Sequence, residues 1–415
     1  MENNTQLKEM IRSMVIDVLQ GQKQDIASSQ PVKQVSRDQG EPGVFDTVDE
    51  AIRAAKEAQL RFEDCTLATR EKVIADIRAA MRPRVQELAQ KTVEETGMGR
   101  VADKVLKLNL TLDKTPGVED LITECETGDN GMTLYELSAY GVIGAITPST
   151  NPAETLICNS IGMLAAGNAI FFSVHPGAKN LSRELVSELN QVIAKSIGIE
   201  NLIVTLREPS IESAQEMMLH PDVSLLVVTG GPGVVKQALQ SGKKVIGAGA
   251  GNPPAFVDET ADVKKAAQDI VLGASLDNNI LCIAEKSVVA MRQIEPQLVQ
   301  EMVKAGCVLV DNQQDIQRLV DLTVLPNGTP NKQFVGKNAS VILDAAHISY
   351  NGDPRLIILR TAKDHPFAVI EMLMPILPVI TVDSFEEGLN VCLMLEAGLH
   401  HTATMHSLNM ERLNH

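Results

Sequence analysis

From Val142 onward the sequence alternates between short apolar runs and helical stretches, and this alternation limits the possible folds more than any other feature. Strands that alternate with helices form βαβ units, whose parallel sheet is covered by helices on both faces. We therefore predict an α/β fold with a doubly wound parallel sheet. The expected strands are 142–147, 169–174, 202–206, 223–229 and 244–247, and the expected helices are 152–166, 181–197, 211–219 and 234–240.

Three polar or glycine-rich breaks follow predicted strands, at 147–152, 229–233 and 247–254. Sheets of this kind bind ligands at the carboxyl ends of their strands. The third break contains G-x-G-x-G but runs into Pro253-Pro254, so no helix begins there and the dinucleotide signal is weak. Thr229–Gly233 joins a strand to a helix whose N-terminus can face a phosphate. A phosphate-binding turn and an ordinary turn both remain open for it.

The first 43 residues are predicted to lie outside the α/β fold, as a helix followed by a linker. Apolar residues recur with helical spacing over 5–20, which predicts an amphipathic helix. The polar tract over 22–43 cannot bury enough apolar surface to fold and is predicted to be a linker. A short amphipathic helix on a tether is typical of docking peptides. The alternative is that the helix folds back on the domain.

Capping, breaking and turn signals predict the elements between these regions and after them. Thr47-Val-Asp-Glu50 is a capping box, Pro83 is expected to kink a long helix, and the turn residues of 127–131 indicate a hairpin. The resulting elements are helices over 47–62, 69–96 and 101–112 and a β-hairpin within 122–140. A second region has helices over 261–270, 297–305 and 385–396 and strands near 287–291, 307–310, 356–359 and 379–382.

Composition excludes several classes of function. The net charge is −16 and the basic residues form no runs, so no nucleic-acid partner is expected. No apolar run reaches membrane-spanning length, and no signal peptide is visible. The six cysteines lie far apart, which favours free thiols in a reducing cytosol. His400, His401 and His406 lack acidic partners at metal-ligand spacing, so we expect structural or pocket-lining roles and no metal site.

Cys282 stands in a short apolar run directly after Asp277-Asn278-Asn279. Its thiol could be a nucleophile or an ordinary core thiol, because free cysteine is often buried, and from the residues alone both readings stay open. Cys158 and Cys307 lie in apolar helical and strand runs and are predicted to be core thiols. Asn151 precedes Pro152 at a helix start, so an N-cap is the simple interpretation.

Several long segments carry a family pattern over essentially the whole chain. They are Glu95–Gly99, Thr147–Pro152, Val228–Gly233, Ser241–Pro254, Gly273–Glu285, Met372–Val379 and His400–Thr402. Together they resemble the aldehyde dehydrogenase superfamily and, within it, the CoA-acylating branch of bacterial microcompartments. The likeness is greatest to the propionaldehyde enzymes of propanediol utilisation, with the acetaldehyde enzymes of ethanolamine utilisation as siblings.

The resemblance implies site residues position by position. Cys282 matches the nucleophile and Asn151 matches the amide of the oxyanion hole. Ala248 stands where hydrolytic relatives carry the glutamate that activates water, and His175-Pro-Gly-Ala178 replaces the family's Lys-Pro-Ser-Glu beneath the adenosine ribose. The implied cofactor-binding positions are Thr147, Pro148, Ser149, His175, Pro176, Thr229, Gly230, Gly231, Gly249 and Glu371, of which Glu371 holds the nicotinamide ribose.

The resemblance also implies an organisation and an activity. It assigns 1–20 to targeting, 21–43 to a linker, 44–121 with 141–250 to dinucleotide binding, 122–140 to an oligomerisation hairpin, and 251–415 to catalysis. Relatives continue past His415, so a truncated C-terminal end is expected. The implied activity is NAD-dependent oxidation of propionaldehyde or acetaldehyde to acyl-CoA by a cytoplasmic homo-oligomer (dimer or tetramer), docked by its N-terminal helix to a microcompartment shell protein. The alternatives are a hydrolytic aldehyde dehydrogenase and a catalytically dead docking protein.

Overall fold

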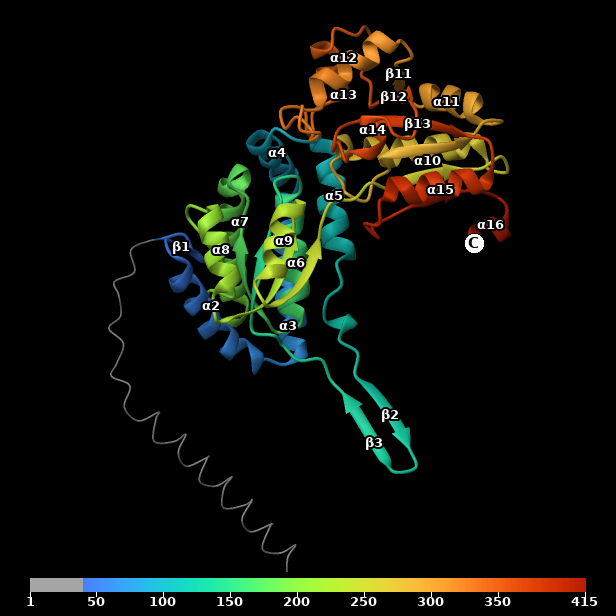
Figure 1. The fold of residues 1–415 in the computed structure, drawn as a ribbon. Helices are drawn as coiled ribbons and strands as arrows, with labels where there is room; N and C mark the ends of the chain where they lie inside the picture. The colour runs from blue at the N-terminus through green and yellow to red at the C-terminus, as the bar shows by residue number, and fades with distance from the viewer. Residues whose placement is uncertain (1–39) are drawn as a thin grey trace, which may run out of the picture. The chain divides into compact units, whose positions relative to one another are not determined.

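The computed structural model describes residues 40–415 (Figure 1). The predicted helix over 5–20 and most of the predicted linker lie outside the described residues. The linker ends earlier than expected, because residues 41–43 contact the folded unit. Glu41 pairs with Arg183 at 3.3 Å, and the Thr205 N–H donates to the Gly43 carbonyl at 2.9 Å.

The first sheet is parallel and confirms the predicted doubly wound pattern. Its strand order is β1-β6-β5-β4-β7-β8, so the chain builds outward from β4 in one direction and then reverses to add β7 and β8 on the other side. All five strands predicted from Val142 onward are present. The bounds are β1 Val44–Phe45, β4 Val142–Ile146, β5 Ala169–Ser173, β6 Ile203–Leu206, β7 Val223–Thr229 and β8 Lys244–Ala248.

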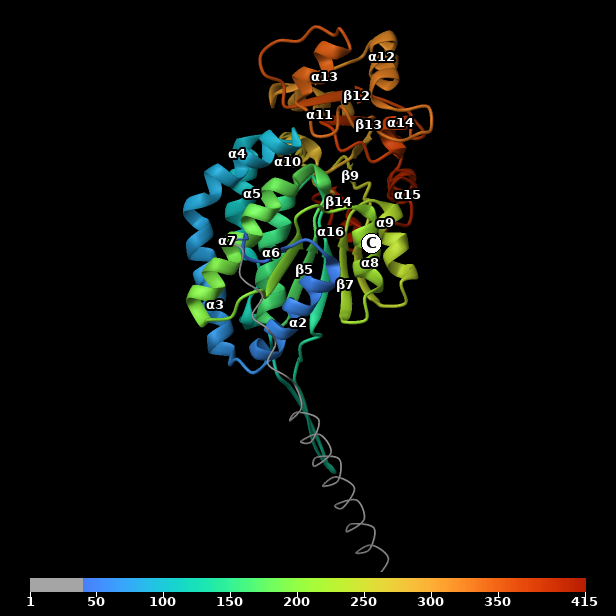
Figure 2. The ribbon, with the colours of Figure 1, turned by 90° about the vertical axis from the view of Figure 1, so that its left-hand side faces the viewer.

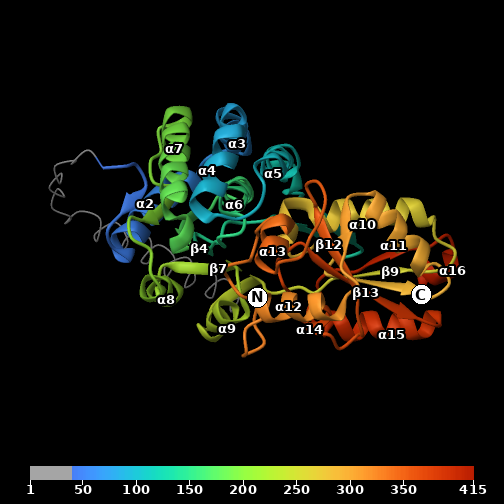
Figure 3. The same cartoon turned by 90° about the horizontal axis from the view of Figure 1, so that it is seen from above.

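Helices cover both faces of this sheet. Figure 3 shows α6 and α7 on one side of β4 and β7, and α8 and α9 on the other. This follows from right-handed crossovers, because reversing the direction of strand addition moves the helices to the opposite face. The bounds are α2 Val48–Glu63, α6 Pro152–Ala165, α7 Lys179–Ile197, α8 Ile211–Leu219 and α9 Pro232–Gln240, with the 3-10 turns η3 Val118–Asp120 and η4 Pro176–Ala178.

At Pro83 the predicted long helix is interrupted by one 3-10 turn. The long helix divides into α3 (Leu67–Met81) and α4 (Val85–Thr96), with the 3-10 turn η2 (Arg82–Arg84) between them. Proline lacks the N–H that would continue the hydrogen-bond ladder. Gly97, in the left-handed conformation, ends α4, and α5 (Val101–Lys114) follows. Thr47 is confirmed as the N-cap of α2, since its hydroxyl accepts from the Glu50 N–H, but the Glu50 carboxylate accepts from that hydroxyl and not from the Thr47 N–H, so only half of the predicted capping box is formed.

The second sheet is also parallel, in the order β11-β12-β13-β10-β9-β14. Side chains along each strand alternate between its two faces, as the period of two requires. Val288 and Ala290 of β10 pack with one apolar cluster, and Val289 and Met291 pack with another. The bounds are β9 Pro254–Val257, β10 Ser287–Met291, β11 Cys307–Leu309, β12 Leu356–Arg360, β13 Ile376–Val382 and β14 Thr404–His406.

Its helices include three that were predicted and several that were not. Figure 3 shows α10 and α15 on opposite sides of β13. The predicted helices are α10 (Val263–Ser275), α11 (Glu295–Lys304) and α15 (Phe385–Glu396). The unpredicted ones are η5 Leu276–Asn279, α12 Gln313–Thr323, α13 Ala339–Ala345 and α14 Pro366–Val369, and the chain ends with α16 Met410–Asn414, where a helix was also expected.

The predicted hairpin is formed by β2 (Glu124–Gly128) and β3 (Gly131–Tyr135), which pair only with each other. All ten of their residues are exposed, and Figure 2 shows the hairpin extending away from the first sheet. Its assignment as an oligomerisation arm stays a prediction.

Of the two predicted core thiols, one is confirmed and one is not. Cys307 is buried as expected, but the prediction of a core thiol at Cys158 is wrong, because that residue lies on the exposed side of α6.

Candidate active site

The first sheet brings most of the predicted cofactor-binding positions to one edge. The loops that begin with Thr147, His175, Thr229 and Gly249 follow the carboxyl ends of β4, β5, β7 and β8, which are neighbouring parallel strands. The direction of strand addition reverses between β4 and β7, and ligands of open α/β sheets bind at such a switch point. Two of the predicted segments, 147–151 and 229–231, flank this point.

Local structure at this edge suits a dinucleotide. The Thr147 hydroxyl is buried and has no hydrogen-bond partner among the described residues, so a polar group of a ligand could satisfy it. Gly231 is the N-cap of α9 and leaves the first N–H groups of that helix without a side-chain cap. A Cβ at Gly231 or Gly249 would meet no atom within 4 Å, so there is space beside the backbone.

The His175 side chain makes a hydrogen bond within its own loop. Its Nδ1 accepts from the Gly177 N–H at 3.0 Å at the start of η4. Burial lowers the pKa of the imidazole, and the Lys332 charge lowers it further. His175 is therefore expected to be neutral at pH 7.

Cys282 lies in a tight turn between η5 and β10 and is half-buried. The turn closes with the Ala284 N–H donating to the Leu281 carbonyl at 3.2 Å. Before it, Asp277, Asn278 and Asn279 all have positive φ, from 50° to 64°. Such backbone is uncommon outside glycine, and Asp and Asn tolerate it best. The polar cluster noted in the sequence is thus what lets the chain turn toward Cys282.

Glu371, His401 and Cys282 all lie against the backbone of Gly251. The Gly251 N–H donates to Glu371 Oε1 at 3.2 Å. A Cβ on Gly251 would lie 2.8 Å from the His401 ring and 2.9 Å from the Cys282 carbonyl oxygen. Only glycine fits this close approach. The carboxylate predicted to bind ribose and the residue predicted to be the nucleophile therefore lie on either side of Gly251, and His401 lies beside them.

Opposing effects set the pKa of the Cys282 thiol. Burial raises it, and the negative charge of Glu371 adds to this, whereas Lys286 and the N–H groups of Cys282 and Ile283 lower it. Lys286 is buried, and its ammonium donates to the carbonyls of Asn279 at 3.1 Å and Leu281 at 2.6 Å. Desolvation lowers the pKa of Lys286 to about 8. The cation and the two backbone donors offset burial only in part, so the pKa of the Cys282 thiol stays above its ordinary value.

Asn151 begins α6, but its side chain makes no capping hydrogen bond. The predicted N-cap position is therefore confirmed through the backbone, because the Asn151 carbonyl accepts from the Thr155 N–H at 3.1 Å, but the side chain takes no part in it. Its Oδ1 instead accepts from the Lys107 ammonium, and its Nδ2 donates only a long bond of 3.3 Å to the Thr150 hydroxyl. The side-chain amide is held on one side and leaves its N–H groups for another acceptor.

Sequence reasoning missed the basic residues that support this site. Lys104 and Lys107 of α5 and Lys286 beside β10 are all buried. One signal was present in the sequence: Lys104 stands four and eight residues before Leu108 and Leu112, on the apolar stripe of its helix. A lysine in such a stripe points to a buried partner.

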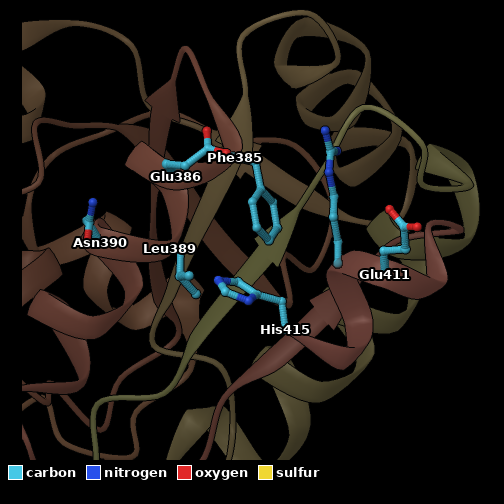
Figure 4. A pocket seen from close by; sticks show the side chains of 7 residues that line it. Phe385, Glu386, Leu389, Asn390, Glu411 and His415 are labelled. Atoms are coloured by element: carbon cyan, nitrogen blue, oxygen red, sulfur yellow. The ribbon is translucent and has the colours of Figure 1, made fainter.

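Elsewhere, Figure 4 shows a hollow between α15 and α16 that contains none of the predicted site residues. It is lined by Phe385, Glu386, Leu389, Asn390, Glu411, Arg412 and His415. Residues 40–415 contain no group of three or more His, Cys, Asp or Glu side chains that could hold a metal ion. Within the same range, no helix has the length and apolar character that a membrane span requires.

The profile of the Aldehyde dehydrogenase family matches residues 19–415. The chain therefore belongs to the aldehyde dehydrogenase family, in agreement with the resemblance seen in its motifs.

Comparison with individual relatives shows which members of the family this chain is similar to. The chain is 48% identical to propanal dehydrogenase (CoA-propanoylating) of Salmonella typhimurium over 413 residues, which are 99% of this chain and 86% of the relative. It is similar, at 45% identity and a TM-score of 0.88, to Rhodopseudomonas palustris propionaldehyde dehydrogenase solved with bound CoA and an acylated cysteine, with 90% of this chain and 85% of that one covered. An engineered glycolyl-CoA reductase with bound NADP⁺ matches with the same identity, coverage and TM-score.

Proposed function

We propose that this protein oxidises a short-chain aldehyde with a nicotinamide dinucleotide and transfers the acyl group to CoA through Cys282. Three findings support the proposal: the family, the 48% identity to a CoA-propanoylating enzyme, and the meeting of Cys282 and Glu371 at Gly251. The main support is the environment of Cys282. Its thiol is half-buried in a tight turn, and the buried Lys286 donates a hydrogen bond to the carbonyl of Leu281 in the same turn.

The residues of this chain divide the reaction into two steps. The Cys282 thiolate attacks the aldehyde carbon and forms a thiohemiacetal, whose oxyanion accepts from the Asn151 amide. A bound nicotinamide dinucleotide would supply the acceptor for the hydride that leaves this carbon, so that Cys282 keeps the acyl group as a thioester. Thr147, Gly231 and Glu371 would hold the dinucleotide, with Glu371 as the residue nearest the thiol. The CoA thiolate then takes the acyl group and releases Cys282.

Transfer to CoA is favoured over hydrolysis by the residue at the end of β8. Ala248 stands there, and its methyl group cannot take a proton from water. Exchange of an acyl group between two thiols is nearly isoenergetic and needs less assistance from a base. Exclusion of water then preserves the thioester.

The test is an assay of nicotinamide reduction with propionaldehyde and with acetaldehyde, each with and without CoA, with product identification by mass spectrometry. We expect CoA-dependent turnover that yields the acyl-CoA, with propionaldehyde preferred and NAD⁺ preferred over NADP⁺. Cys282→Ser should abolish turnover, and Cys158→Ser, which changes an exposed thiol on α6, should not. Free acid formed at full rate without CoA would instead establish the hydrolytic alternative.

The sequence also supports a proposal about location. The amphipathic pattern over 5–20 and the microcompartment branch of the resemblance favour docking of this segment to a shell protein inside a bacterial cell. Deletion of residues 1–20 should leave turnover unchanged and abolish co-purification with shells. Equal co-purification of the parent and the deletion variant would contradict the docking role.

A further inference from the structure

A buried ionic cluster joins α5 to the turn before Cys282. Asp277 Oδ2 accepts from Lys104 at 3.0 Å and from Lys107 at 2.5 Å, and its Oδ1 accepts from the Arg100 N–H at 2.9 Å. The side chains of Lys104 and Asp277 are fully buried, and that of Lys107 is 8% exposed. Buried charges need such partners, because each one loses its hydration.

The two lysines share Asp277 but differ in their other contacts. Lys104 donates to the Thr150 carbonyl, a backbone group, at 3.1 Å. Lys107 donates to Asn151 Oδ1 and lies 3.3 Å from Glu154, on the first turn of α6. Lys107 therefore contacts the one side chain of this loop to which the proposed chemistry gives a role.

The contact of Lys107 fixes which end of the Asn151 amide faces the site. An ammonium group has donors and no acceptor, so it can bind the amide oxygen but not the amide nitrogen. A half-turn of the amide would place its N–H groups against a cation and its oxygen toward the developing oxyanion. The Lys107 contact makes that orientation unfavourable.

We propose that Lys107 is a positioning residue, which holds the Asn151 oxygen so that the amide N–H groups point toward the oxyanion formed on the Cys282 adduct. The inference rests on the proposed function, in which Asn151 donates to that oxyanion. A donor fixed before the reaction costs no reorganisation when charge develops.

The surroundings of Lys107 keep it charged. Desolvation acts to lower its pKa, but the charges of Glu154 and Asp277 outweigh this and hold the pKa above its ordinary value. Both Glu154 carboxylate oxygens lack hydrogen bonds among the described residues, so the ion pair with Lys107 is the contact that balances this buried charge. The contact to Asn151 therefore persists over the whole pH range of an activity assay.

The test compares Lys107→Met, Asn151→Ala and the double variant. Losing an oxyanion donor typically costs about a hundred- to a thousand-fold in kcat, and we expect Lys107→Met to lose about 10- to 100-fold because the amide is present but free to turn. The KM for propionaldehyde should change less than about threefold, since the loss falls on the transition state. In the Asn151→Ala background, Lys107→Met should lower kcat by less than about twofold, because the group on which it acts is absent.

Lys104→Met is the matched control. It removes an equally buried cation from the same carboxylate, so a purely structural role would give both lysine variants the same kinetics. We expect the kcat loss of Lys104→Met to multiply with that of Asn151→Ala. Multiplication of the Lys107→Met loss as well would overturn the proposal.

Two further results distinguish failure of the positioning role of Lys107 from failure of the proposed function. If Lys107→Met does not fold, Lys107→Gln replaces it, since its amide can present either its oxygen or its nitrogen to Asn151 and should also lower kcat by about tenfold or more. Full activity of Lys107→Gln would refute the positioning role. If Asn151→Ala or Cys282→Ser itself retains full turnover, the proposed function fails instead, whatever the lysine variants show.

Discussion

Lys286 and Glu371 act on the Cys282 thiol with opposite signs. The cation of Lys286 lowers the pKa of the thiol, and the anion of Glu371 raises it. Since the thiolate is the nucleophile, Lys286→Met should slow alkylation of Cys282 by iodoacetamide at pH 7 and move its pH profile to higher pH. The difference from the parent should be greatest below pH 8 and fade above it, because the pKa of Lys286 is about 8.

Glu371→Gln should move the same alkylation profile to lower pH, since it removes the negative charge that opposes thiolate formation. Lys265→Met is the control for loss of a cation, because Lys265 is exposed and paired with Asp269 on α10. Profiles that shift in the same direction for the Lys286 and Glu371 variants would contradict the electrostatic account.

At the scale of elements, the turn between α4 and α5 must lie close to η5. Gly99 has a φ of 81°, and a Cβ there would stand 2.0 Å from Asp277 Oδ1. Gly99→Ala combines a left-handed backbone with a clash against a buried carboxylate, so we expect it to lower the free energy of unfolding by about 2–4 kcal/mol. Urea unfolding followed by circular dichroism measures this change.

Gly162→Ala provides the matched control. Gly162 is exposed in α6, and a Cβ there would meet no atom within 4 Å. The substitution should raise stability by about 0.5–1 kcal/mol, because alanine loses less backbone entropy in a helix. Equal stability of the Gly99→Ala variant and the parent would show that the turn relaxes away from Asp277.

The same elements show what could be predicted from the sequence. Helical and strand periods located α15 and the five first-sheet strands between Val142 and Ala248 to within about a residue, whereas β13 begins three residues before the predicted start and β14 was not predicted. Strand β9 was missed because it begins at Pro254, inside a glycine-rich break. Proline is tolerated at the first residue of a strand, but it resembles a turn signal in the sequence.

The candidate site was predictable only in part. Cys282, Asn151 and Glu371 stand in motifs that are recognisable locally. Lys107 is paired with Asp277, which lies 170 residues further along the chain, and a lysine on a helix is usually solvent-exposed. Such a contact depends on how α5 packs against η5 in the tertiary structure, and the local sequence pattern of neither element predicts that packing.

At the scale of the whole molecule, charged contacts join the region of α5 to the second α/β region. Arg355 pairs with Asp103 at 2.7 Å, Arg100 pairs with Asp353 at 3.0 Å, and Asp277 binds both lysines of α5. The Asp353 partner is 71% exposed, whereas Asp277 is fully buried. Exposed pairs contribute about 0–1 kcal/mol, and removal of one partner from a buried pair costs about 3–5 kcal/mol. The stability of the molecule should therefore depend on Asp277 far more than on Asp353.

The pH dependence of unfolding distinguishes these two pairs. Desolvation acts to raise the pKa of Asp277, but Lys107 and Lys104 outweigh it and hold the pKa below 3.8. A carboxylate with a lowered folded pKa contributes stability that is fully present above its unfolded pKa and lost as pH falls through the folded value. Asp277→Asn should thus lower the free energy of unfolding by about 3–5 kcal/mol at pH 7. Its difference from the parent should shrink progressively below pH 3.8.

Urea unfolding of the parent, Asp277→Asn and Asp353→Asn at pH 7 and pH 3 measures both effects. Asp353→Asn should stay within about 1 kcal/mol of the parent at either pH, because its exposed pair is screened by solvent. An Asp277→Asn variant as stable as the parent at pH 7 would show that the two lysines find other partners. A loss of the same size at both pH values would show that Asp277 contributes through packing and not through its charge, since only the charge disappears as the carboxylate is protonated.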